Sequence, residues 1–237
     1  MGYRLLGISP HRDQPERPET LKYGIFFLGI FTYVAHTIAT GANPWRWLLV
    51  WPAITVLTLA AGYLLNKPGF VLGKRDDGRV SKWLFVVNLP WLVFLYALWY
   101  VSIALSREDV INRVGDSNIY LSRRPLVGDL EEDFDVIVDL TAEFVEDKKR
   151  GQRYFHLPWL DGVAPSEFRM PDGLTKETKV LVHCAQGHGR TATYASILMT
   201  KLGLTASPIE AYEKILRYRP HAKMSKQQKR FIESYGQ

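Results

Sequence analysis

The stretch HCAQGHGRT, residues 183–191, determines how the rest of this sequence is interpreted. It contains Cys184, the only cysteine of the chain, and it ends on Arg190 and Thr191. The apolar run KVLVHC before it is typical of a buried strand, and TATYASILM after it is typical of a helix. The stretch is therefore predicted to be a strand-to-helix turn. Unpaired backbone N–H groups and the helix dipole favour an anion at such a turn, phosphate above all.

The residue types in this turn suit chemistry on a phosphate ester. Gly187 and Gly189 let the backbone curl around an anion without Cβ clashes, and the guanidinium of Arg190 can donate two hydrogen bonds to phosphate oxygens. The same positive potential favours the thiolate over the thiol, which would make Cys184 a charged nucleophile. The hydroxyl of Thr191 could hydrogen-bond its sulfur. The simpler alternative is a structural glycine turn with a buried cysteine.

The pattern His-Cys, five residues, Arg-Thr resembles the signature of the protein tyrosine phosphatase superfamily, and residues 117–237 look most like its dual-specificity branch. The resemblance implies an α/β fold with a central, mostly parallel sheet flanked by helices. It also implies a covalent phosphocysteine intermediate, with no cofactor and no metal. We call residues 184–190 the signature loop. By the resemblance, phosphate is bound by Ala185, Gln186, Gly187, His188, Gly189 and Arg190, and the catalytic residues include Cys184, Arg190 and Thr191.

The family also uses an aspartic acid, which protonates the leaving oxygen and then activates water. Asp161, in HLPWLDG, matches that position, and Asp172, in MPDGLTKET, is the alternative. His183 is expected to support the loop by hydrogen-bonding its carbonyls, although simple packing at the strand end would also explain it. A catalytically inactive relative is a further alternative, which the presence of Cys184 and Arg190 disfavours.

The N-terminal part of the chain has a different composition. Residues 1–20 are polar and contain three prolines, and they are predicted to be a flexible tail. Apolar runs follow, each reaching the length of about 20 residues that a bilayer-spanning helix needs. Residues 21–106 are therefore predicted to be a membrane region with three transmembrane helices, at 21–42, 45–65 and 83–106. Buried helices of a soluble domain are an alternative, as is a signal peptide for the first run.

Charges return at residue 107, and residues 107–237 are predicted to be the phosphatase domain. Short runs rich in β-branched and aromatic residues predict strands at 118–121, 134–140, 153–159 and 178–184. Helical spacing predicts helices at 191–203, 207–219 and 225–235. Ser207, Pro208 and Glu210 indicate a helix start with a capping box, and Gly203 indicates a helix end.

The distribution of positive charge predicts an orientation in the membrane. Four Lys and Arg lie in residues 1–22 and five in residues 66–82, whereas the opposite side of a three-span arrangement has Arg46 and four in residues 107–124. The positive-inside rule then places the N-terminus inside, and three spans place the catalytic domain outside. The exposure of a reactive thiolate to oxidation argues for the other side.

These observations together predict an integral, multi-pass membrane protein that is a cysteine-dependent phosphatase hydrolysing phosphomonoesters. The substrate is either a protein carrying phosphotyrosine, phosphoserine or phosphothreonine, or a phospholipid. The lipid bilayer is the expected partner and nucleic acid is not. A short tether favours lipid phosphates, because it holds the active site near the headgroups. Two alternatives stay open: a non-catalytic membrane sensor that binds phosphorylated partners, and a rhodanese-type sulfurtransferase.

Overall fold

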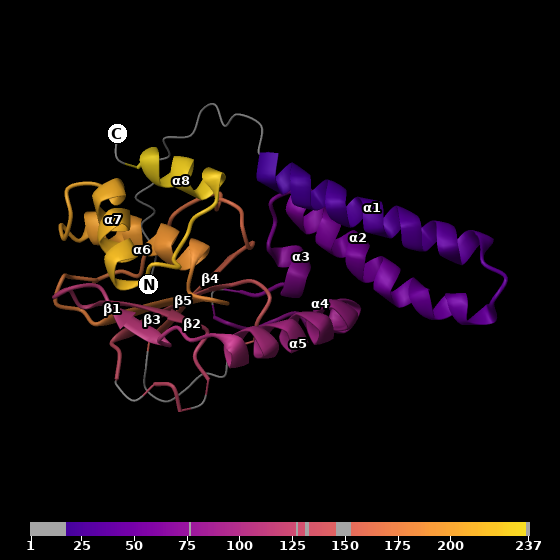
Figure 1. The fold of residues 1–237 in the computed structure, drawn as a ribbon, viewed down its shortest axis with the longest axis horizontal. Helices are drawn as coiled ribbons and strands as arrows, with labels where there is room; N and C mark the ends of the chain where they lie inside the picture. Colours follow the sequence, from indigo (N-terminus) through magenta and orange to yellow (C-terminus); the bar gives the residue numbers. More distant parts are fainter. Residues whose placement is uncertain (1–17, 76, 127, 131–132, 146–152, 236–237) are drawn as a thin grey trace.

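The computed structural model describes residues 18–235, apart from 76, 127, 131–132 and 146–152. Residues 1–17 of the predicted tail lie outside the described residues, and 18–20 form the first turn of helix α1 (Pro18–Thr40). A mixed sheet with helices against it makes up the C-terminal part, and a group of apolar helices extends to one side of it (Figure 1). The predicted α/β class is confirmed.

The sheet has five strands in the order β1-β2-β5-β3-β4. Only the edge strand β1 is antiparallel. Every residue of β3 and β5 is buried, including Asp139 and His183, as expected for parallel strands that are covered on both faces. The four predicted strands are confirmed within two residues at each end, and β1, which has three residues, was not predicted. The strands are β1 (Ile111–Arg113), β2 (Ile119–Arg123), β3 (Val136–Thr141), β4 (Arg153–Trp159) and β5 (Val180–Cys184).

The two faces of the sheet have different surroundings. Along β5, Val182 and Cys184 belong to the main core with α6, α7 and α8, whereas Leu181 belongs to a smaller cluster on the opposite face. Because successive side chains alternate across a strand, His183 shares the face of Leu181. The three helices lie together above the sheet in Figure 1. They are α6 (Gly189–Lys201), α7 (Pro208–Tyr218) and α8 (Lys226–Glu233).

Local signals fix the ends of these helices. The Ser207 hydroxyl accepts from the backbone N–H of Glu210 at 3.2 Å, which confirms the predicted N-cap. The Glu210 carboxylate, however, accepts from Ala206 N–H at 2.8 Å rather than from Ser207, so the capping box is displaced by one residue. Gly203 has a φ of +70° just after α6, where an L side chain would be strained, and the predicted helix end is confirmed.

Helices α1 and α2 (Val50–Leu64) form a long antiparallel hairpin, joined through the short helix η1 (Pro44–Leu49) (Figure 1). Two segments, Glu19–Thr40 and Pro44–Leu64, are long and apolar enough to cross a bilayer. The tip of the hairpin is far from the sheet. Its other end touches the α/β part, because the Glu19 carboxylate accepts from Gln227 N–H at 3.2 Å.

The prediction of a third span at 83–106 is wrong. The apolar run is divided into α4 (Lys82–Val87) and α5 (Leu89–Leu105), and α5 has only 17 residues. Asn88 is fully buried at the break, where its side-chain amide donates to the carbonyls of Phe70 and Val71 at 3.2 and 2.8 Å. These carbonyls belong to α3 (Gly69–Leu72), so one polar residue ties the break in the apolar run to a neighbouring helix.

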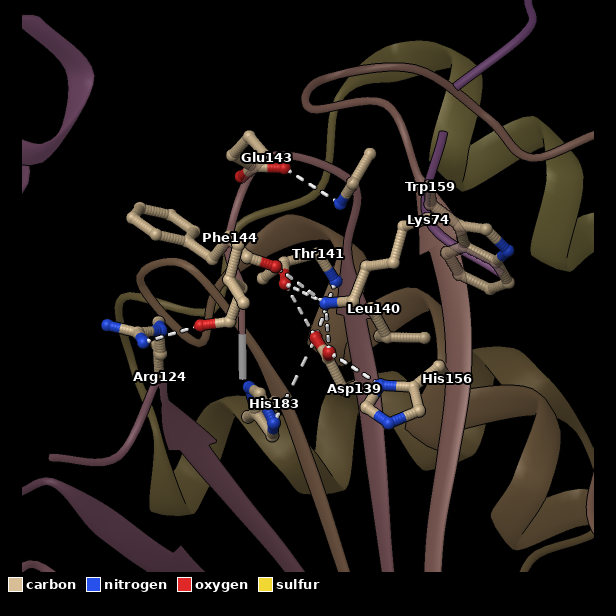
Figure 2. Close-up of polar contacts among 12 residues, drawn as sticks. Lys74, Arg124, Asp139, Leu140, Thr141, Glu143, Phe144, His156, Trp159 and His183 are labelled. Carbon is tan, nitrogen blue, oxygen red and sulfur yellow. Dashed lines mark hydrogen bonds and ion pairs between the residues drawn. The ribbon is translucent and has the colours of Figure 1, made fainter. Parts of the chain in front are cut away.

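The segment between α3 and α4 enters the sheet domain and buries a lysine there. Lys74, with its side chain 1% exposed, forms an ion pair with Asp139 on β3 and donates to Thr141 Oγ1 at 3.1 Å and to the Phe144 carbonyl at 2.8 Å (Figure 2). His156 Nδ1 lies 3.0 Å from the same carboxylate. Burial alone would raise the pKa of Asp139, but Lys74 and the His156 contact outweigh it and hold that pKa well below its usual range.

Removal of the lysine should therefore destabilise the whole protein. Lys74→Met leaves a buried carboxylate without its counter-ion, which typically costs about 3–5 kcal/mol. We expect a lower thermal midpoint in detergent than for Lys67→Met, a control at an exposed lysine just before α3. Adding Asp139→Asn to Lys74→Met should restore part of the loss. Equal midpoints for the two lysine variants would contradict a structural role of the pair.

The same pair should appear in the pH dependence of stability. Because the pKa of Asp139 is lower in the folded than in the unfolded state, its contribution is present at neutral pH and is lost as the pH falls below about 4–5. The Lys74→Met, Asp139→Asn double variant should lose less stability than the wild type between about pH 5 and pH 2, measured by thermal melts at each pH.

Candidate active site

The signature loop begins at the carboxyl end of β5 and ends in the first turn of α6. Cys184 is the last residue of the strand and is 3% exposed, with Arg123 of β2 as its neighbour in register. The strand-to-helix turn predicted from the sequence is confirmed. Since β3 and β4 run parallel to β5, the residues that follow them lie at the same edge of the sheet.

The carbonyl groups of the loop are held from outside. Trp99 Nε1 on α5 donates to the Ala185 carbonyl at 2.9 Å, and the Arg219 guanidinium donates to the carbonyls of Gln186 and Gly187 at 3.1 and 2.9 Å. Within the described residues, the N–H groups of residues 185–189 have no hydrogen-bond acceptor. With the carbonyls directed outward to these donors, the loop presents its N–H groups to an anion.

One glycine of the loop is required by its surroundings. Gly187 has a φ of +71°, and a Cβ atom there would collide with the backbone carbonyl of Ser122 at the end of β2. Both the conformation and the close approach exclude other residues without a shift of the backbone. The loop therefore lies tightly against the sheet edge, which fixes its curvature.

Arg190 is buried and held in a single orientation. Its two terminal nitrogens contact the two carboxylate oxygens of Glu143 at 2.8 and 2.6 Å, and Nη1 also donates to the Trp159 carbonyl at 3.0 Å. Burial alone would lower the pKa of Arg190, but Glu143 and then Asp161 outweigh it and raise the pKa above its usual value. The guanidinium is therefore a fixed positive charge behind the loop.

Asp161 lies beside this arginine, and Asp172 does not. Oδ1 of Asp161, in the loop after β4, is 3.2 Å from Arg190 Nε, and its side chain is 72% exposed. The carbonyl of Asp172 accepts a hydrogen bond from Arg153, the first residue of β4. Arg153 lies at the amino ends of the parallel strands, whereas Cys184 lies at their carboxyl ends. Of the two aspartates considered from the sequence, only Asp161 is brought to the signature loop.

The remaining predicted residues have mixed outcomes. The Thr191 hydroxyl is buried and has no hydrogen-bond partner among the described residues, so it is available to a group in the loop. Likewise, the His183 ring makes no hydrogen bond to a loop carbonyl in the described part of the chain. It faces Asp139 across 4.0 Å (Figure 2). Burial, only partly offset by Asp139, lowers the pKa of His183 to about 4, so the ring is neutral at physiological pH.

Sequence reasoning missed three residues that hold this site: Glu143, Arg219 and Glu108. His188 of the loop contacts Glu108 at 2.8 Å, and Arg219 lies 3.6 Å from the same carboxylate. Partial burial would raise the pKa of Glu108, but His188 and then Arg219 lower it overall. The signals were weak, because each residue is an ordinary charge in its own segment and only the fold brings it to the loop.

One protein-family model matches the part of the chain that contains the signature loop. Residues 151–234 match the model of the family PTP-SAK, described as the Swiss Army Knife protein, DSP-PTPase phosphatase domain. Among curated proteins, none matches the chain. The matched region runs from β4 to α8 and includes the whole signature loop, which supports the resemblance to the protein tyrosine phosphatase superfamily.

Several solved structures are similar to about half of the chain. Tk-PTP in its active form has 24% sequence identity over 54% of this chain and 96% of its own, with a TM-score of 0.40. A putative dual specificity phosphatase from mouse, complexed with zinc tungstate, has 16% identity over 55% of this chain and 89% of its own, with a TM-score of 0.45. PTPMT1 in complex with PI(5)P has 16% identity over 54% and 95%, with a TM-score of 0.41.

The pair between Arg190 and Glu143 generates a prediction. Glu143→Gln removes the charge that orients the guanidinium, and we expect kcat/KM on a soluble phosphomonoester to fall by about 10-fold or more, since partners of a buried arginine are typically worth at least 1.4 kcal/mol. Glu213→Gln, at an exposed glutamate of α7, is the matched control. If both variants retained the wild-type rate, Glu143 would have no part in positioning Arg190.

Proposed function

We propose that this chain is a membrane-anchored, cysteine-dependent phosphatase that hydrolyses phosphomonoesters through a phosphocysteine intermediate. One observation carries the proposal: Cys184 lies at the base of a loop with free N–H groups, and Arg190 and Asp161 stand 3.2 Å apart at the same sheet edge. A nucleophile, an anion cradle and an acid are thereby combined in one place. No other residue of the chain can act as a thiol nucleophile, because Cys184 is its only cysteine.

In the proposed first step, the Cys184 sulfur attacks phosphorus and the bond from phosphorus to the leaving oxygen breaks. The N–H groups of residues 185–189 and Arg190 stabilise the three equatorial oxygens. The Nη atoms of Arg190 are occupied by Glu143, so its Nε side, now in contact with Asp161, is the side that meets the phosphate. Asp161, released from that contact, donates a proton to the leaving oxygen.

In the second step, the Asp161 carboxylate accepts a proton from water, the water oxygen attacks phosphorus, and the phosphorus–sulfur bond breaks. Phosphate leaves and the sulfur departs as a thiolate. The unpartnered Thr191 hydroxyl is the proposed donor to that departing sulfur. The exposure of Asp161, 72% of its side chain, gives water access to the base.

The surroundings of the loop favour a membrane-bound substrate. On one side, the Tyr63 hydroxyl at the end of α2 reaches the Asp161 carbonyl at 3.5 Å, and the Tyr23 hydroxyl of α1 lies against Gly162. On the other side, Trp99 of α5 bonds to the loop. The two candidate spans thus contact the loop that carries Asp161, and the apolar helix α5 contacts the signature loop. We therefore propose that lipid phosphate esters are better substrates than soluble phosphopeptides.

The catalytic domain is proposed to lie on the cytoplasmic side. The sequence-based placement outside depended on three spans and fails with the third. With two spans, residues 1–22, residues 66–82 and the catalytic domain share one side, and the opposite side has only Arg46 near the hairpin tip. The positive-inside rule then places the domain inside, where a thiolate is also kept reduced. A cysteine introduced at Lys176, labelled only after lysis of intact cells, would support this placement.

The nucleophile and the arginine can be tested directly. Cys184→Ser should abolish turnover of p-nitrophenyl phosphate while binding of inorganic tungstate persists, because the cradle remains. Arg190→Lys should lose about 10²–10³-fold in kcat, because an ammonium cannot form the paired contacts. Arg230→Lys, at an exposed arginine of α8, is the control. Were Cys184→Ser to retain about a tenth of the wild-type rate, the covalent mechanism would be wrong. An absence of turnover in the wild-type protein would instead favour a sensor or a sulfurtransferase.

The acid has a distinct kinetic signature. Asp161→Asn should slow hydrolysis of alkyl phosphates much more than that of nitrophenyl phosphate, because a poor leaving oxygen needs the proton and a good one does not. Asp172→Asn, at the opposite edge of the sheet, is the matched control and should change neither rate. Equal losses on both substrates for Asp161→Asn would remove it from the role of acid.

A further inference from the structure

The break between α4 and α5 lies deep along α2. Trp51 Nε1 of α2 donates to the carbonyls of Val86 and Val87, both at 3.1 Å, and Thr55 Oγ1 donates to the Val87 carbonyl at 2.6 Å. From Thr55 to the end of α2 at Leu64 the helix rises about 14 Å, at about 1.5 Å per residue. That is about half of a hydrocarbon core about 30 Å thick.

The polar groups freed at this break are hydrogen-bonded by neighbouring helices. The carbonyls of α4 accept from α2, the buried Asn88 amide donates to α3, and Thr58 Oγ1 donates to Asn88 Oδ1 at 2.6 Å. Inside a bilayer, non-helical backbone is tolerated only where protein satisfies its polar groups in this way. A corner exposed to water could use solvent in place of these side chains.

The two flanks of this corner return to the same side. Before the corner, Lys74 is buried against Asp139 in the sheet domain. After it, Trp99 bonds to Ala185, and Ser102 Oγ accepts from Gln186 Nε2 at 2.6 Å. The chain thus leaves the sheet domain, reaches the middle of α2 and comes back to the sheet domain, which a spanning helix cannot do. In Figure 1, α4 and α5 lie alongside the hairpin without reaching its tip.

The outer face of α5 is apolar and uncovered. No charged residue occurs between Trp83 and Ser106. The outward side chains lie at helical spacing and are half to three-quarters exposed, which in water would be a large apolar patch. They are Val93, Phe94, Leu98, Val101 and Leu105, with exposures of 63, 53, 52, 56 and 77%. Helix α5 packs on α2, the second candidate span, which itself exposes the apolar side chains Val50, Ile54 and Leu57.

We propose that α4 and α5 are a re-entrant membrane segment. It enters the bilayer on the side of the catalytic domain, turns at Asn88 near mid-depth, and leaves on the same side with its outer face in contact with lipid acyl chains. Its inner face holds the signature loop at Ala185 and Gln186, so the loop is fixed at the headgroup level. The inference rests on the proposed membrane anchoring, and it does not depend on the phosphatase activity.

Single cysteines in a Cys184→Ser background test this topology. The positions are Trp45→Cys at the hairpin tip, Arg79→Cys between α3 and α4, and Lys176→Cys in the sheet domain, all exposed in the folded chain. Each is treated with a membrane-impermeant maleimide in intact cells and again after lysis. A re-entrant segment requires Arg79→Cys and Lys176→Cys to label from one side and Trp45→Cys from the other. Three spans would instead group Lys176→Cys with Trp45→Cys and overturn the proposal.

Leu98→Cys supplies the second measurement, since it lies on the outer face of α5. It should stay unlabelled in membranes from either side and react once detergent is added. Labelling of Leu98→Cys in intact membranes would place α5 in water and overturn lipid contact. If all four positions labelled from both sides of sealed vesicles, the chain would not be inserted in the bilayer, and the proposal would be overturned. Turnover by the wild-type protein, which retains Cys184, is measured separately and tests the phosphatase proposal.

Discussion

The ion pair between Lys74 and Asp139 joins the two parts of this molecule. Two charges are removed from water there, and such burial is favourable only when the remaining polar atoms are also paired. Thr141, the Phe144 carbonyl and His156 provide those partners (Figure 2). The lysine comes from the segment between the apolar helices and the aspartate from the central sheet, so neither part completes its own buried site.

This pair is also connected, through two adjacent residues of the chain, to Arg190, the proposed catalytic arginine. Lys74 Nζ holds the Phe144 carbonyl, and the preceding residue, Glu143, carries the carboxylate that fixes Arg190. A shift of the segment after β3 would therefore move Glu143 and tilt the guanidinium behind the signature loop. On the other side, α5 holds the loop carbonyl of Ala185 through Trp99. The segment before α4 and helix α5 thus contact the candidate site, or the residues beside it, at two points.

Much of the site was predictable because its signals are local. The strand before Cys184, the glycines, Arg190 and the helix after them lie within about twenty residues, and Asp161 lies two residues after the end of β4. The helix ends at Ser207 and Gly203 were found for the same reason. Glu143 and Arg219 were not found, because their roles depend on strand order and on a contact between segments more than thirty residues apart.

The error in the third apolar run has a physical cause that a length criterion overlooks. Residues 83–106 are long enough to span a bilayer, but a straight spanning helix would take the Asn88 amide away from its partners on α3, and an unpaired amide in hydrocarbon is costly. In the folded chain the helix is interrupted at Asn88, and the Asn88 side-chain amide donates hydrogen bonds to backbone carbonyls of α3. Thr55 and Thr58, two hydroxyls on an apolar helix, mark the place on α2 that receives this break. Polar residues inside two apolar runs, such as Thr58 in one and Asn88 in the other, indicate where the two runs contact each other. Hydropathy averaged over a whole run does not show the positions of such residues.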